Sequence, residues 1–265
     1  MNRKILNVIR ILLILVCIGI IIYEGAHIYT DQKEYTVAED EYTEIINQAT
    51  SVPLYDNTDN EDEIVGYPLI TIDHEQLNSI NEDYVAWLYF PAMEIAYPVV
   101  KETTVNEYLY KTFEGTSNKA GCIFEDILSD ENFCGMHDIV FGHNMKNGSM
   151  FGKLKQLYNK PETAALIDSN PYIYVYTKDH VYQYRVFAYY RTVVGSSAYS
   201  VVENKSQYDE FIKFIEPQTT YKIPDDISFK DYPSILTLST CSGQSGSGRR
   251  FVIHSVKTGS WSTTN

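Results

Sequence analysis

Three residues in the sequence could together carry out acyl transfer: Cys241, Arg250 and His143. A cysteine thiolate attacks a carbonyl carbon, and negative charge then develops on the carbonyl oxygen. An arginine guanidinium is always charged and can stabilise that oxygen with a fixed fork of donors. A histidine can hand a proton to the leaving amine. These residue types therefore predict a nucleophile, an oxyanion stabiliser and an acid/base for an amide substrate.

The C-terminal part of the sequence predicts how Cys241 and Arg250 could meet. Residues 234–240 and 251–256 are each typical of a β-strand, and residues 242–248 between them are only Ser, Gly and Gln. This order predicts an antiparallel strand pair joined by a flexible loop. Cys241 should then lie at the end of the first strand.

Side-chain alternation along this strand pair selects one of two neighbouring arginines. Because side chains in a strand point alternately to opposite faces, Thr237, Ser239 and Cys241 should share one face. On the second strand the same parity places Arg250, and not Arg249, on the face of the cysteine. A bulge in either strand would reverse this register.

Of the six histidines, His143 has the most informative surroundings. Residues 138–141 read as a strand that runs into a turn at residues 142–145, and active-site residues favour strand ends and loops. Taken singly, each of the three residues is more often structural, as a buried thiol, a surface histidine or a solvated arginine. Spacing alone does not place His143 beside the strand pair.

The composition narrows the class of partner and the compartment. The formal net charge is −14, and no basic cluster follows residue 10, which argues against binding to nucleic acid or to an anionic membrane surface. Four cysteines give no disulfide framework, because Cys17 lies in an apolar segment and leaves an odd number for the rest of the chain: Cys122, Cys134 and Cys241. Outside the cell at least one of these thiols must be unpaired.

The N-terminal segment reads as a membrane anchor. Residues 5–23 are apolar except for Asn7 and Arg10, with basic residues before them and acidic residues after them. This pattern predicts a transmembrane signal-anchor within residues 1–26, with the N-terminus in the cytoplasm and the rest of the chain outside. A cleaved signal peptide is the alternative, although Glu24 stands where cleavage needs a small residue.

Residues 27–73 are expected to form a stem. Apolar and aromatic residues spaced among charges predict an amphipathic helix over residues 30–50, and residues 51–63 are a polar, acidic linker. The acidic residues of this region are typical of a solvated surface.

Residues 74–265 are expected to form one folded domain. A short helix is predicted over residues 74–80, followed by a first strand at residues 85–90 that Pro91 ends. Most of the remaining sequence consists of short β-type runs separated by Gly, Pro and Asn, and the 23 tyrosines of the chain contribute to these runs.

The segment Thr237–Cys241, followed by Arg250, resembles the sortase signature, in which a TLxTC-type strand carries the nucleophile and the next strand an essential arginine. Further segments resemble the first two strands (residues 83–88 and 95–100), the GSIFLD-like segment (121–126) and the histidine motif (140–151) of class B sortases. The resemblance runs from about His74 to Val256. The chain departs from the pattern at Cys122, where a serine is usual, and in the loop after Cys241, which lacks acidic residues.

This resemblance implies a mainly β fold with helices: an eight-stranded sortase β-barrel, an N-terminal helical pair, and an extra helix before the last strands, near residues 207–215. It also implies that Cys241 is the nucleophile, His143 the general acid/base and Arg250 the cation that stabilises the oxyanion or orients the substrate. Three further residues become candidates for substrate binding: Ser239, Thr240 and Tyr199.

The activity implied by the resemblance is cleavage of secreted proteins at a C-terminal sorting signal of the Asn-Pro-x-Thr type, after the Thr. The acyl fragment, held as a thioester, would pass to an amine of the peptidoglycan cross-bridge, and no cofactor or metal is expected. Two alternatives remain open. A pilin-polymerising sortase would accept a lysine side chain instead, and a non-catalytic, surface-anchored β-domain would use the fold for adhesion.

Overall fold

A computed structural model describes residues 3–51, 66–159, 161–243 and 246–263 of the chain. Its centre is a closed barrel of eight strands in the order β10, β8, β7, β3, β4, β5, β6 and β9. The predicted eight-stranded barrel is therefore confirmed. The strands are β3 (Tyr84–Phe90), β4 (Ile95–Lys101), β5 (Ile123–Glu125), β6 (His137–Phe141), β7 (Tyr172–Tyr176), β8 (His180–Val193), β9 (Ile235–Cys241) and β10 (Arg249–Ser262).

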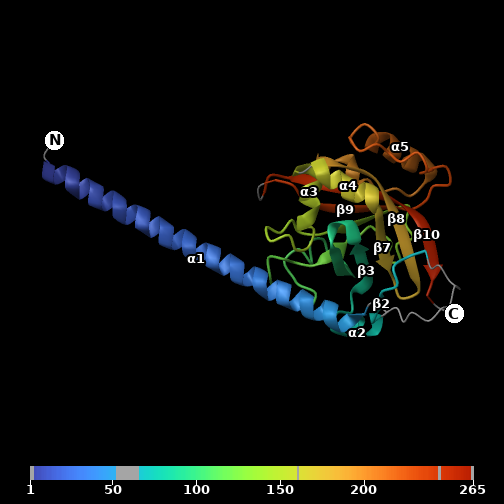
Figure 1. The fold of residues 1–265 in the computed structure, drawn as a ribbon, viewed down its shortest axis with the longest axis horizontal. Helices are drawn as coiled ribbons and strands as arrows, with labels where there is room; N and C mark the ends of the chain where they lie inside the picture. The colour runs from blue at the N-terminus through green and yellow to red at the C-terminus, as the bar shows by residue number, and fades with distance from the viewer. Residues whose placement is uncertain (1–2, 52–65, 160, 244–245, 264–265) are drawn as a thin grey trace.

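Helices, 3₁₀ turns and one further strand pair complete the structure around the barrel (Figure 1). Two further strands pair with each other outside it, β1 (Thr50–Ser51) and β2 (Thr71–Ile72). The helices are α1 (Arg3–Ala49), α2 (His74–Ile80), α3 (Gln156–Asn159), α4 (Ala164–Ser169) and α5 (Lys205–Ile215), with 3₁₀ turns at Pro91–Met93, Gly152–Lys155, Pro161–Thr163 and Ser197–Tyr199. Helix α2 has the predicted bounds, and α5 begins two residues before the helix expected at 207–215.

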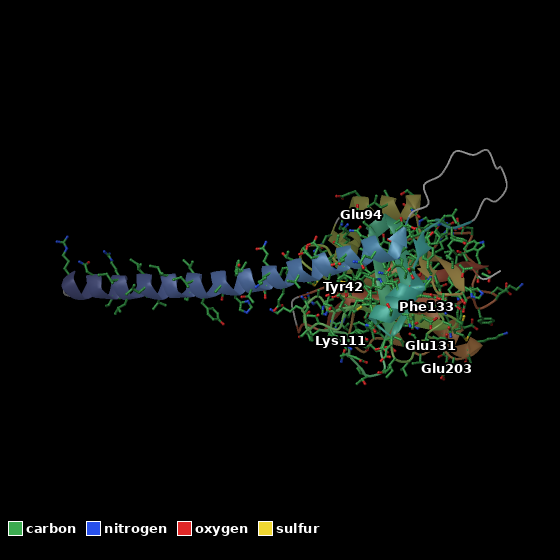
Figure 2. All side chains as sticks on the ribbon, turned by 90° about the horizontal axis from the view of Figure 1, so that it is seen from below. Tyr42, Glu94, Lys111, Glu131, Phe133 and Glu203 are labelled. Carbon is green, nitrogen blue, oxygen red and sulfur yellow. The ribbon has the colours of Figure 1, made fainter. Side chains whose placement is uncertain are left out.

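Helix α1 runs without a break through the expected anchor and the expected stem helix. Its N-terminal part extends away from the barrel as a single rod (Figures 1 and 2). Among the described residues it is the one helix long and apolar enough to cross a membrane, over a stretch that begins at Ile9. The linker predicted at 51–63 falls almost entirely outside the described residues.

The C-terminal part of α1 packs against the barrel. Ala38, Tyr42 and Ile45 are buried in the same core cluster as the barrel strands, and Figure 2 labels Tyr42 at this junction. The Tyr42 hydroxyl donates to the Gly121 carbonyl at 2.9 Å, and it accepts from the Phe113 amide at 3.3 Å. This half of the predicted amphipathic helix is therefore part of the core, and together with α2 it forms the expected helical pair.

The register of the last two strands agrees with the prediction from parity. Strand β10 runs antiparallel to β9, and Arg250 pairs with Cys241, Val252 with Ser239, and His254 with Thr237. On the other side of β9, β6 runs parallel to it. Paired residues in neighbouring strands point to the same side, so the three strands present one continuous face.

Helix α5 lies over one end of that face. Its N-cap is Asn204, whose side chain accepts from the Gln207 amide at 3.1 Å. Its apolar side buries four residues against the outside of the barrel: Tyr208, Phe211, Ile212 and Ile215. Both faces of strand β9 are consequently buried over most of its length, and the strand becomes half-exposed only at Cys241.

Candidate active site

Cys241 is the last residue of β9 and is half-buried, whereas Ser239 and Thr240 before it are buried. Its position directly opposite Arg250 follows from the antiparallel register of β9 and β10. The guanidinium of Arg250 donates one hydrogen bond to the Arg249 carbonyl at 3.1 Å. The cysteines resolved by the structure are all free thiols, so Cys122 and Cys134 do not form a disulfide.

His143 follows β6 at a turn that requires a glycine before it. A Cβ atom on Gly142 would lie 2.5 Å from Ile123 Cδ1 and 2.8 Å from the ring of Phe151. Those distances are shorter than van der Waals contact, so a larger residue would push the turn away from the barrel. Gly142 therefore allows the backbone to pass close to the core before it presents the imidazole.

One hydrogen bond fixes the tautomer of His143. Its Nε2 lies 2.6 Å from the carbonyl oxygen of Leu109, which can only accept, so Nε2 carries the proton. In the neutral ring, Nδ1 is then the nitrogen that can take up a proton. Burial lowers the pKa of His143, and the positive charge of Arg250 lowers it further, while the bond to Leu109 acts in the opposite direction.

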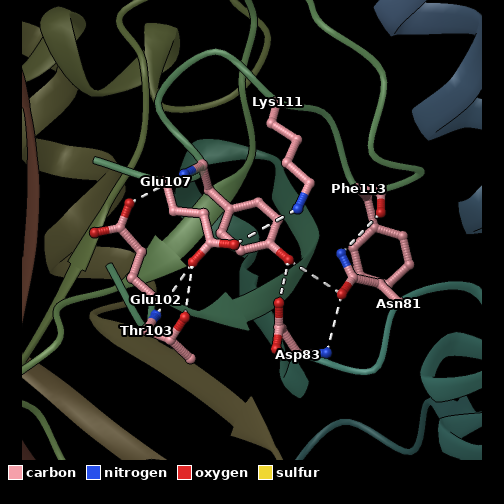
Figure 3. A network of polar contacts seen from close by, with 8 residues as sticks. Asn81, Asp83, Glu102, Thr103, Glu107, Lys111 and Phe113 are labelled. Atoms are coloured by element: carbon pink, nitrogen blue, oxygen red, sulfur yellow. Dashed lines mark hydrogen bonds and ion pairs between the residues drawn. The ribbon is translucent and has the colours of Figure 1, made fainter. Parts of the chain in front are cut away.

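The loop that carries Leu109 is held by a network of polar contacts (Figure 3). The Glu102 carboxylate accepts from the backbone amides of Asn106 and Tyr108, both at 3.1 Å. The Tyr108 hydroxyl donates to Asp83 at 2.6 Å, which ties the loop to the segment that precedes β3. These bonds hold the Leu109 carbonyl in place before any ligand binds.

A second set of bonds ties the His143 turn to the end of β9. The Asn144 side-chain amide donates to the Cys241 carbonyl at 2.7 Å. The Thr240 hydroxyl donates to the Gly142 carbonyl at 2.7 Å, and the Gly142 amide donates to the Ser239 carbonyl at 3.1 Å. Cys241 and the two residues before it are thus linked to the residues on either side of His143.

The structure brings five of the six predicted site residues to one pocket of about 270 Å³: His143, Ser239, Thr240, Cys241 and Arg250. Further wall residues come from the loop that holds Leu109, and from Phe124, Asp126 and Phe141. A thiol, an imidazole and a guanidinium that line one pocket can act on the same carbonyl group.

Tyr199, the sixth predicted residue, lines an adjoining pocket of about 240 Å³ that shares Arg250 and Phe141 with the first. Its hydroxyl is 2.9 Å from Ser239 Oγ, and its ring stacks on Phe141 at a centroid distance of 6.0 Å. Burial raises the pKa of Tyr199, and the Arg250 charge opposes this shift. The guanidinium charge therefore favours a lower pKa at Tyr199 as well as at His143. Together the two pockets form a groove with Cys241 near one end.

Two contacts at this site were missed at the sequence level. The Leu109 carbonyl is a backbone group, and no side-chain pattern could mark it. Asn144 directly follows the histidine and belongs to the motif at residues 140–151, but its bond to Cys241 becomes visible only when β6 and β9 lie side by side.

Comparison with known proteins identifies the class to which this barrel and site belong. The model of the sortase domain family matches residues 88–258, and the chain belongs to the sortase family. The matched range contains the whole groove, from His143 to Arg250.

Several similar proteins are sortases of class B. The chain is 26% identical to sortase B of Listeria monocytogenes over 237 residues, which cover 86% of this chain and 88% of the relative. The crystal structure of sortase B from Bacillus anthracis in complex with AAEK1 superposes with a TM-score of 0.66 at 25% identity, over 85% of this chain and 98% of that one. A Staphylococcus aureus sortase B–substrate complex gives a TM-score of 0.61 at 26% identity, over 69% and 83%.

Proposed function

We propose that this protein is a membrane-anchored cysteine transpeptidase. It cleaves secreted proteins at a C-terminal sorting signal of the Asn-Pro-x-Thr type and transfers the acyl fragment to a peptidoglycan amine. The observation that carries the proposal is the meeting of Cys241, His143 and Arg250 at one pocket. The structural similarity to a sortase B–substrate complex supports it.

In the first step, Nδ1 of His143 takes up the thiol proton of Cys241, and the sulfur attacks the carbonyl carbon of the signal's Thr residue. The C–N bond to the next residue breaks, and the leaving amine takes a proton from His143. Because Nε2 is engaged with Leu109, Nδ1 is the nitrogen that exchanges this proton. The lowered pKa of His143 makes its cation a stronger acid toward that amine.

Arg250 stabilises the negative charge that develops on the carbonyl oxygen during the attack. It pairs with Cys241 across the strands and lines the same pocket, which supports this role. A guanidinium keeps its charge through the whole reaction and offers two donors in a fixed plane.

In the second step, an amine of the cell-wall cross-bridge attacks the thioester, and His143 accepts the proton that this amine releases. The thiolate leaves, and the secreted protein becomes attached to the wall by an amide bond. We propose that α1 holds the enzyme on the outer face of the membrane, where the client proteins emerge.

The test is a peptide library with sequences of the form Asn-Pro-x-Thr-x, incubated with the full chain and analysed by mass spectrometry. We expect a mass increase on Cys241 that equals the peptide up to its Thr, and transfer of that fragment when a cross-bridge amine is added. A matched peptide with Ala in place of Pro should give neither product. Transfer to lysine side chains alone would favour the pilin-polymerising alternative, and failure to acylate Cys241 with any member would overturn the proposal.

A further inference from the structure

A chain of four hydrogen bonds crosses the buried part of the face that carries Cys241. The Tyr190 hydroxyl is 2.9 Å from His254 Nε2, and His254 Nδ1 is 2.7 Å from Thr237 Oγ1. Thr237 Oγ1 is also 2.7 Å from His137 Nε2, and His137 Nδ1 is 2.8 Å from the carbonyl oxygen of Ser200. The chain thus connects strands β8, β10, β9 and β6 to the segment that follows Tyr199.

The carbonyl at the end of this chain fixes the direction of every bond in it. Ser200 O can only accept, so His137 Nδ1 carries the proton, and the Nε2 of the neutral ring accepts from the Thr237 hydroxyl. Having donated its single proton, the Thr237 oxygen accepts from His254 Nδ1. His254 Nε2 then accepts from the Tyr190 hydroxyl. With both histidines neutral, every donor and acceptor in the chain is matched.

The surroundings keep both histidines neutral. Both rings are buried, and Thr237 between them is fully enclosed. Burial lowers the pKa of His137 to about 4 and lowers that of His254 well below its ordinary value. Helix α5 supplies an aromatic cover, because Phe211 packs against His137 at a centroid distance of 4.3 Å, with the rings tilted by 37°, and meets the His254 ring edge-on at 5.7 Å.

The bonded carbonyl belongs to the segment that positions Tyr199 in the substrate groove. Residues 196–200 form a 3₁₀ turn in which the Tyr199 amide donates to the Ser196 carbonyl at 3.1 Å. Ser200 directly follows Tyr199, so the bond from His137 anchors the end of this turn on β6. From there Tyr199 reaches Ser239 and Phe141 at the groove.

We propose that His137 is a positioning residue for the substrate groove. Its Nδ1–H holds the Ser200 carbonyl and thereby keeps the Tyr199 hydroxyl on Ser239, while the Thr237–His254–Tyr190 chain locks the imidazole in the one tautomer that can donate there. The role in substrate binding rests on the proposed function. The anchoring of the 196–200 segment can be measured independently of that function.

Two substitutions of the same histidine separate the two bonds of its ring. In His137→Asn the amide nitrogen lies close to the former Nδ1 position and can still donate to Ser200. In His137→Gln the amide reaches the former Nε2 position, so it contacts Thr237 and leaves the Ser200 carbonyl without its donor. Both variants lose the imidazole ring and its packing against Phe211. Each variant therefore serves as the control for the other in packing and in the folded fraction.

We expect His137→Gln to raise KM for the sorting peptide about fivefold over His137→Asn, the effect of about one neutral hydrogen bond, with kcat nearly equal. A loss of folded protein would instead lower kcat in both variants and leave KM unchanged. Amide hydrogen exchange of residues 199–200 in the full chain in detergent should be faster in His137→Gln than in His137→Asn. Exchange in α5 should be equal in the two. The exchange measurement does not depend on turnover, so it tests the anchoring of residues 199–200 even when no peptide is cleaved.

Equal KM values and equal exchange rates at residues 199–200 in the two variants would overturn the proposal. If neither variant folds, Thr237→Val and Thr237→Ser replace them, since the Val keeps the shape of Thr without a hydroxyl and the Ser keeps the hydroxyl. Faster exchange at residues 199–200 in the Val variant than in the Ser variant is then required. Equal rates in that pair also reject the proposal.

Discussion

The same face of strands β6, β9 and β10 carries two very different polar clusters. At one end Thr237 lies between His137 and His254, fully buried beneath α5, and its hydroxyl is bonded to both rings. Four residues further along β9, Cys241 opens into a pocket that His143 and Arg250 also line. Each end therefore combines a small polar side chain with at least one histidine that lies on a neighbouring strand or in the turn directly after one.

The two ends differ in how deeply they are buried and in whether they contain a charged side chain. The buried end contains no charged side chain in its hydrogen-bond chain, and each donor there has an acceptor. The open end keeps a permanent cation, Arg250, and a histidine with one nitrogen left for proton transfer. Similar residue types thus stabilise the fold where a helix buries them. Where they line an open pocket, they are available for chemistry.

The first test of this comparison changes Cys241 at the open end. Cys241→Ala should abolish turnover, because the sulfur is the atom that is acylated in the proposed reaction. The free energy of unfolding should change by less than about 1 kcal/mol, since the side chain is small and only half-buried. Mass spectrometry with a sorting peptide and urea unfolding measure the two quantities. A covalent adduct on the variant would show that another residue is the nucleophile.

The second test separates two adjacent arginines. Arg250→Lys should reduce kcat about a hundredfold, because an ammonium on a flexible stem cannot reproduce two fixed donors at the oxyanion. Arg249 pairs with Val193 and is exposed, so Arg249→Ala should stay within a few-fold of the original turnover. The measurement is steady-state cleavage of a fluorogenic sorting peptide. A larger loss for Arg249→Ala would mean that the wrong arginine has been assigned to the oxyanion.

The sequence predicted the open end better than the buried end. Strand periodicity was sufficient to pair Arg250 with Cys241, because that inference needs only two strands joined by one loop. The position of His143 at the same pocket as this pair could not be predicted from spacing, since it depends on the parallel pairing of β6 with β9 across about a hundred residues. The resemblance to a family supplied that step.

The chain of buried hydrogen bonds had no signal in the sequence. His137 and His254 are far apart in the chain and belong to no common motif. Their bonds to Thr237 exist only because β6 and β10 both flank β9 and because α5 closes over them. The length of α1 was also underestimated, because an anchor and an amphipathic helix were inferred separately from two different patterns of apolar residues.

The third test uses pH to act on the buried end. The folded pKa of His137 is lowered to about 4, so its contribution to stability is complete above the unfolded value of about 6.5 and is lost as the pH falls through this window. At pH 5 the loss should be roughly 2 kcal/mol for this residue, judged from the difference between the two pKa values. His254 acts in the same direction.

Urea unfolding at pH 7 and pH 5 measures this effect as a difference between variants. The pKa of the buried Asp138 carboxyl is raised to about 6, which gives a pH dependence of the opposite sign, so the original chain alone is not sufficient. His137→Asn should lose less stability than the original chain between the two pH values. His180→Asn, outside the hydrogen-bond chain, should behave like the original. Equal losses in all three proteins would show that His137 is not held neutral.

The smallest effect is expected from removal of residues 1–31, which lie outside both clusters. The deletion takes away the apolar rod of α1 and the exposed ion pair between Asp31 and Lys119, and it leaves Tyr42 and Ile45 in the core. Exposed ion pairs contribute little to stability, so the fragment should fold.

The turnover of a sorting peptide by this fragment in solution should equal that of the full chain in detergent within a factor of about two, because neither cluster contacts the deleted part. The same fragment should no longer attach a client protein to the wall of a cell, since it lacks the proposed membrane anchor. A fragment that unfolds cooperatively but cleaves far more slowly than the full chain would mean that α1 acts on the groove as well as on localisation.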